Sequence, residues 1–134
     1  MIDQQSALVY TMVLASAADS DMTDAEIGMI DSIVRHLPVF AGYNADGLSG
    51  TANACVDLLS QSDGLDQVLD AVRDSLPERL YETAYALACD IVAADGEASQ
   101  QELRLLEMLR HRLDVERLDA AAIERGARAR FARI

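Results

Sequence analysis

The chain has 134 residues, a length that fits one domain and allows a substantial buried core. Its formal net charge of −12 argues against binding of duplex nucleic acid, which needs a surplus of cations to neutralise phosphates. Only 4% of the residues are aromatic and none is Trp, so the core must consist mainly of Ala, Leu, Val, Ile and Met, which suit close-packed helices.

The N-terminal part of the chain predicts two helices. Residues 8–18 are continuously compatible with a helix, and Leu8, Met12 and Ala15 fall on one face of it. A second helix is expected to begin after Thr23, because apolar residues follow at helical spacing, and Pro38 marks its expected end.

The middle and C-terminal parts predict five more helices. The segment 38–50 contains three Gly and a Pro and is expected to be a loop. Shorter helices are expected at about 48–60 and 65–76, and a longer one opens at Pro77 and runs to about Ala94, since Pro is tolerated in a first helical turn. Helices at about 100–112 and 115–131 complete the set. No segment predicts a strand, so we expect an all-α fold, a compact bundle of about seven helices in one domain spanning residues 1–134.

Cysteine usage and hydropathy indicate the cellular setting. Cys55 and Cys89 lie in apolar helical stretches, and we interpret them as buried thiols in a reducing compartment rather than as a disulfide. No apolar run reaches the roughly 18 residues that a membrane span needs. The first apolar run is preceded by an acid and no base, unlike a secretory signal, so the expected location is cytoplasmic.

A shift of the chain by 76 residues reveals an internal repeat, because it places residues 17–33 on residues 93–109 with every compared pair identical or chemically similar. We therefore expect two helical hairpins of the same design, with repeat halves around 8–39 and 84–115, on either side of the middle helices. The matched residues are Ala17, Ala18, Asp19, Asp21, Thr23, Glu26, Ile27, Ile30 and Ile33 with Ala93, Ala94, Asp95, Glu97, Ser99, Glu102, Leu103, Leu106 and Leu109.

The turn inside each hairpin has the form of a capping box. Thr23 is followed by Glu26, and Ser99 by Glu102, so each hydroxyl can accept from the amide three residues on while the Glu reaches back to the cap amide. The acids also lie near the positive end of a helix dipole. Capping alone therefore accounts for these four residues without any ligand.

Capping does not account for the acids that precede the caps. These form i, i+2 pairs, Asp19 with Asp21 and Asp95 with Glu97, and such a pair directs oxygens toward a common space, as Ca²⁺ or Mg²⁺ requires. Neither loop has the bidentate Glu of an EF-hand, so a single loop would bind weakly and a tight site would need both loops or more carboxylates. Two interpretations stay open, helix caps with solvated charge and a divalent-cation site.

The motif AADGE followed by S-x-x-E-L at 93–103, with its twin AADSD and T-x-x-E-I at 17–27, resembles the tellurite-resistance TerB family and the related N-terminal domain of the DjlA co-chaperone. The resemblance covers nearly the whole chain. It implies a compact helical fold with pseudo-symmetric hairpins, and a role in stress-response or membrane-associated assemblies through partners rather than catalysis. The first copy departs from the pattern where Ser20 replaces Gly, which predicts a different loop geometry. The resemblance also implies a divalent-cation site, which by position comprises Asp19, Asp21, Glu26, Asp95, Glu97 and Glu102.

Two functions are therefore expected. The first is a non-enzymatic TerB-like stress-response domain that binds Ca²⁺, Mg²⁺ or a similar cation through its acidic loops. The alternative is a protein-protein interaction module with an acidic docking face and no metal. Residues 1–103 hold 18 acids and three bases and residues 104–134 hold 5 and 8, which gives net charges of −15 and +3, and the acidic part would steer a basic partner.

The same observations limit the partners and the chemistry. We expect protein partners, a second copy of the chain among the candidates, with no nucleic acid and no membrane insertion. No nucleophile lies in a recognisable elbow, and His36 and His111 fall near predicted helix C-termini, where a cation is favourable. No enzymatic activity is expected.

Overall fold

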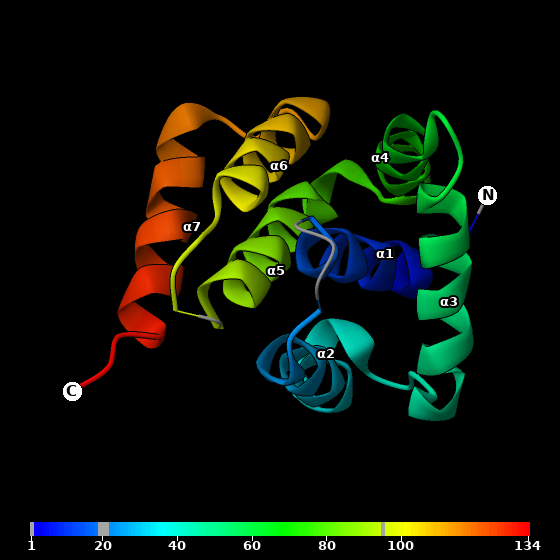
Figure 1. The fold of residues 1–134 in the computed structure, drawn as a ribbon, viewed down its shortest axis with the longest axis horizontal. Helices are drawn as coiled ribbons and strands as arrows, with labels where there is room; N and C mark the ends of the chain where they lie inside the picture. The colour runs from blue at the N-terminus through cyan, green and yellow to red at the C-terminus, as the bar shows by residue number, and fades with distance from the viewer. Residues whose placement is uncertain (1, 19–21, 95) are drawn as a thin grey trace.

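The computed structural model describes residues 2–18, 22–94 and 96–134. All regular structure in these residues is helical, with no strand, which confirms the expected all-α fold (Figure 1). The helices are α1 (Gln4–Ser16), α2 (Asp24–His36), α3 (Leu48–Leu59), α4 (Gly64–Ser75), α5 (Tyr81–Ala94), α6 (Gln100–Arg112) and α7 (Arg117–Arg130), with 3₁₀ turns η1 (Pro38–Phe40), η2 (Ala45–Gly47) and η3 (Glu78–Leu80).

The first helix begins earlier than its apolar pattern predicted. α1 starts at Gln4 because Asp3 caps it, accepting a hydrogen bond from the amide of Ser6 at 2.7 Å. It ends at Ser16, two residues before the expected end at Ala18. The residue that indicates the start of α1 is the cap Asp3, which lies outside the apolar run.

Two further segments differ from the expectation. Pro77 does not open the long helix, because it is extended, with φ −70° and ψ 151°, and caps the short turn η3, so that α5 begins only at Tyr81. The expected loop at 38–50 contains the turns η1 and η2, whereas α3 begins at Leu48, where its helix was expected. The buried side chain of Phe40 anchors η1.

The core is organised around α1 and α5, which pack against each other at the centre of the molecule (Figure 1). Every residue of α1 from Ala7 to Ser16 is buried, as expected for a helix that is apolar on all sides. α3 and α4 pack on α1, α7 packs on α5, and α2 and α6 each contact both central helices. The amphipathic helices therefore form the outer layer, and the first helix of each repeat lies inside.

The two hairpins match the expected repeat in register. α2 and α6 each have 13 residues, and both the first residues, Asp24 and Gln100, and the last, His36 and Arg112, lie at equivalent repeat positions. The helices that follow the two acidic turns therefore have the same length and begin at equivalent positions of the repeat.

The two cysteines are free and buried, as expected. Burial raises the pKa of both the Cys55 and the Cys89 thiol to about 12, so neither carries charge at neutral pH. In the part of the chain that the structure describes, each helix is too short or too polar to cross a bilayer.

Candidate functional site

The turn before α2 forms the predicted capping box. The hydroxyl oxygen of Thr23 accepts a hydrogen bond from the amide of Glu26 at 3.1 Å, and Glu26 Oε1 accepts one from the amide of Thr23 at 2.9 Å. The Thr23 hydroxyl also donates to Glu26 Oε1 at 3.1 Å. These bonds satisfy amides at the helix start that have no partner within the helix.

The turn before α6 repeats this arrangement. Glu102 Oε1 accepts from the amide of Ser99 at 2.8 Å, and the Ser99 hydroxyl accepts from the amide of Glu102 at 3.1 Å. We define the two acidic turns as residues 19–26 and 95–102; their last four residues, 23–26 and 99–102, form the same hydrogen-bonded capping box.

The two capping carboxylates are unusually well buried. Glu26 is 1% exposed and Glu102 is 2% exposed, whereas acidic side chains are rarely buried to this extent. Removal of a carboxylate from water is costly unless hydrogen bonds and favourable charge replace the lost hydration. The cap amides and the positive ends of the α2 and α6 dipoles supply part of that replacement.

The remaining acids of the predicted cation site are placed differently. Glu97 lies within the second turn and is exposed. Asp19, Asp21 and Asp95 lie outside the described residues, so the prediction that they join the capping acids in one site stays a prediction. Within residues 2–18, 22–94 and 96–134, no cluster of three or more His, Cys, Asp or Glu side chains could hold a metal ion. The described carboxylates alone therefore do not form a site.

The second turn depends on a glycine. Gly96 has φ +98°, a left-handed conformation that side chains with a Cβ rarely adopt. Ser20 occupies the equivalent position in the first copy, but it lies outside the described residues. A Cβ built on Gly96 would come within 3.7 Å of the Arg133 guanidinium, so a basic group from the C-terminal segment lies against the second acidic turn.

Comparison with known families now adds to this geometry. The family model described as tellurite resistance protein TerB matches residues 5–125. The chain belongs to the TerB family. No curated protein and no solved structure matches the chain. The match spans both hairpins of this TerB chain and the helices between them, which confirms the resemblance inferred from the paired acidic motif.

Two arginines of the basic C-terminal part pair with acids of the TerB fold itself. Arg112 on α6 forms ion pairs with Asp66 at 3.0 Å and Asp70 at 2.5 Å on α4, and Arg130 on α7 pairs with Asp90 on α5. These pairs join the positive charges to acids on neighbouring helices at the surface. The charges of Arg112 and Arg130 are thus partly neutralised within the fold.

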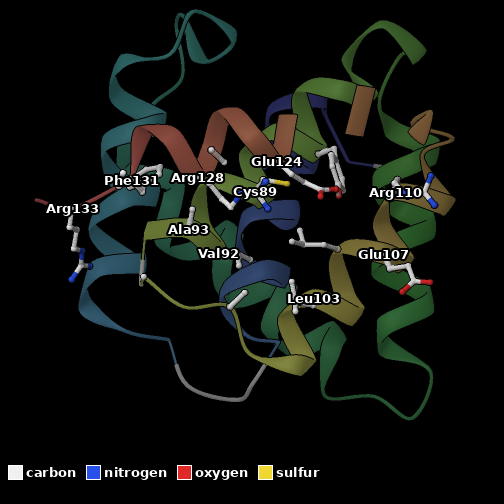
Figure 2. A pocket seen from close by; sticks show the side chains of 16 residues that line it. Cys89, Val92, Ala93, Leu103, Glu107, Arg110, Glu124, Arg128, Phe131 and Arg133 are labelled. Atoms are coloured by element: carbon white, nitrogen blue, oxygen red, sulfur yellow. Dashed lines mark hydrogen bonds between the residues drawn. The ribbon is translucent and has the colours of Figure 1, made fainter. Parts of the chain in front are cut away.

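Sequence reasoning did not find the cavity beside the second turn, which lies between α5, α6 and α7. It has a volume of about 620 Å³, and its inner wall includes a hydrogen bond of 2.7 Å from the Tyr85 hydroxyl to Glu124 Oε2 (Figure 2). Burial raises the pKa of the Tyr85 hydroxyl, so it remains a hydrogen-bond donor at neutral pH. No local motif could predict this contact, because its residues are 39 positions apart on different helices.

Proposed function

We propose that this TerB-family chain is a non-enzymatic, cytoplasmic stress-response domain that binds a divalent cation at its acidic turns. The observation that carries the proposal is the near-complete burial of Glu26 and Glu102 at equivalent positions of the two turns. Each repeat therefore holds a carboxylate in a poorly hydrated environment next to further acids in the sequence.

Charge balance supports a cation at these turns. Negative groups that are close together and poorly hydrated raise the cost of ionisation, and a bound cation lowers that cost. Among the ion pairs that described residues form, none involves Glu102. A hard cation such as Ca²⁺ or Mg²⁺ suits the oxygen ligands that an acidic turn provides.

The six predicted residues take two different roles in this proposal. Glu26 and Glu102 hold the turns closed, because Oε1 of each already accepts the cap amide. The acids that precede the caps are the ligands. These are Asp19, Asp21, Asp95 and Glu97.

Thermal unfolding of chelator-treated protein, titrated with Ca²⁺, Mg²⁺, Mn²⁺ and Zn²⁺, tests the proposal. Ligand at about 100 times its dissociation constant should stabilise the fold by roughly 2.7 kcal/mol. We expect Asp19→Asn and Asp95→Asn to reduce the stabilisation by the preferred cation, while Asp57→Asn, an exposed control on α3, retains it. Retention of the full effect in both turn variants would place the cation elsewhere.

An interaction module with an acidic docking face is the second candidate, and a specific observation favours it. Ile27 and Leu103, which occupy equivalent positions one residue after the capping Glu, are 50% and 49% exposed. An apolar side chain beside an acidic turn is the combination that a basic partner with an apolar anchor would contact.

This second function predicts binding that is independent of metal and sensitive to salt. Because exposed charges are screened within about 10 Å at 0.1 M salt, affinity for a basic partner protein should fall as salt rises. Ile27→Ser and Leu103→Ser should weaken the binding, whereas Leu118→Ser, which alters a side chain 83% exposed on α7, should not. Binding that needs a cation and ignores salt would favour the first function.

A further inference from the structure

An apolar groove of about 550 Å³ lies between α1, α3, α4 and α6, and we call it the α3–α4 groove. Val56 on α3 and Leu65 on α4 line it and are 44% and 36% exposed. The partly buried Met108 continues the apolar wall on α6. Removal of this apolar surface from water by a partner would be favourable, so the groove is a candidate docking surface.

Charge is divided between the two sides of the α3–α4 groove. Asp57 follows Val56 on α3, Asp63 precedes α4 close to Leu65, and both acids are exposed. Arg104, which is also exposed, lines the groove from α6. Among the residues that the structure describes, these three charged groups take part in no ion pair. The groove is therefore acidic toward α3 and α4 and carries a positive group toward α6.

The outer face of α7 carries the complementary pattern. Leu118 is 83% exposed, and Ala122, one turn later, is exposed on the same side of the helix. At 3.6 residues per turn, Arg117 and Arg125 lie on one side of this apolar strip and Asp119 lies on the other, all exposed. No ion pair within residues 2–18, 22–94 and 96–134 involves these three charged groups. The outer face of α7 thus presents an apolar anchor between basic groups and an acid.

The two surfaces lie toward opposite ends of the molecule. Figure 1, with the longest axis horizontal, shows α7 at one end and α3 at the other, with α1 and α5 between them. Because α7 packs on α5, its outer face lies away from the α3–α4 groove of its own chain. A contact between two different surfaces is heterologous, so each copy could bind two neighbours in an open chain.

We propose that copies of this chain associate head to tail, with α7 of one copy in the α3–α4 groove of the next. Leu118 packs between Val56 and Leu65 of the next copy. The arginines of α7 face the acids of α3 and α4, while Asp119 faces Arg104. A uniformly basic helix would repel Arg104 and a uniformly acidic one would repel the acids, so the mixed charges of α7 favour a second copy as the occupant. The contact uses no cation and goes beyond the proposed function.

Sedimentation equilibrium of the chain in chelator tests this inference, over about 1 μM to about 1 mM protein, which covers the dissociation constants of weak complexes. We expect the average mass to rise reversibly past that of two chains, since an open heterologous contact does not end at a dimer. The rise should be smaller at high salt, because salt screens the paired charges. A constant monomer mass, a plateau at two chains, or a rise that ignores salt would overturn the proposal.

Two variants each block one surface. Leu118→Glu removes the α7 anchor and Val56→Arg places a positive charge in the groove, and each should weaken association at least tenfold. Circular dichroism checks that both variants keep their helix content; if Val56→Arg unfolds, Asp57→Arg at an exposed position replaces it. Ile27→Ser is the control, because it removes a half-exposed apolar side chain on α2, outside both surfaces. An equal loss in the control would show that exposed apolar surface in general drives association, and would contradict the proposal.

A mixture of the two blocked variants tests the heterologous contact itself. Leu118→Glu keeps its groove and Val56→Arg keeps its α7 face, so the mixture can form one contact between the two variants. We expect complexes that contain one chain of each variant and grow no further, although each variant alone stays monomeric. A mixture that stays monomeric at concentrations where the native sequence associates, or a variant that still associates with itself, would overturn the proposal.

Discussion

The carboxylate of Glu102 accepts a hydrogen bond from the amide of Ser99 at 2.8 Å, and the hydroxyl of Ser99 accepts one from the amide of Glu102 at 3.1 Å. These two reciprocal bonds cap the start of α6. Thr23 and Glu26 do the same at the start of α2, 76 residues earlier. The acidic turns of this TerB-family domain are thus built on one repeated local device.

Loss of either cap hydroxyl should destabilise the fold. Ser99→Ala or Thr23→Ala removes the acceptor for the amide of the third helical residue, and we expect a loss of about 1 kcal/mol in the free energy of unfolding. Denaturant unfolding measures the change, with Ser62→Ala, at an exposed position before α4, as the control. An effect no larger than that of the control would mean that the caps contribute little.

Two glycines should respond in opposite directions to replacement by alanine. A Cβ on Gly64 at the start of α4 would lie 2.7 Å from Leu59 Cα and closer still to the carbonyl oxygen of Leu58, so Gly64→Ala should cost about 1 to 3 kcal/mol. Gly28 lies inside α2 with open space where its Cβ would be, so Gly28→Ala should stabilise by about 0.5 to 1 kcal/mol. Urea unfolding measures both changes in the free energy of unfolding. If the two changes had the same sign, the close packing at the start of α4 would be contradicted.

The thiols should be unreactive in the folded protein and should make stability depend on pH. At pH 8 a thiol reagent should label Cys55 and Cys89 only after denaturation, because burial holds both pKa values near 12. In the unfolded chain the thiols lose their protons near pH 9, so their contribution is fully present below that pH and is lost as pH rises through about 12. Cys55→Ala should flatten the decline in stability above pH 9, and rapid labelling of native protein would refute the burial.

The pairs between α4 and α6 should add little stability. Arg112 is 27% exposed and Asp70 is 64% exposed, so solvent screens their attraction, and Asp70→Asn should cost only about 0.5 kcal/mol. Urea unfolding at low and high salt measures the effect, which should shrink at high salt. Asp57→Asn serves as the unpaired control on α3. A salt-independent loss above 2 kcal/mol would indicate a far more buried interaction.

Local features of the sequence predicted most of the fold. Capping boxes and hydrophobic spacing depend on residues within one or two helical turns, so α2 and α6 begin where Thr23 and Ser99 indicated. The start of α1 was missed because it depends on the cap Asp3 and not on the apolar run. The long helix was expected to begin at Pro77 because Pro is allowed in a first helical turn. The structure instead places Pro77 in extended backbone before η3.

The candidate sites were less predictable, because they depend on packing between distant residues. The burial of Glu26 and Glu102 could not be read from the capping motif, which is usually solvent-exposed. The cavity forms where α7 packs on α5 beside α6, and contacts such as Tyr85 with Glu124 join helices far apart in the chain. The prediction that Asp19, Asp21 and Asp95 share a cation site stays a prediction.

Calorimetric titration of chelator-treated protein with Ca²⁺ and with Mg²⁺, in parallel for the native sequence and for a variant carrying both Asp19→Asn and Asp95→Asn, tests the cation proposal most directly. We predict saturable heat of binding with at least one of the two cations for the native sequence and its loss in the double variant, with circular dichroism showing the same helix content in both. Absence of binding to the native protein, or equal binding to the double variant, would contradict the proposal that the acidic turns of this TerB domain hold a cation.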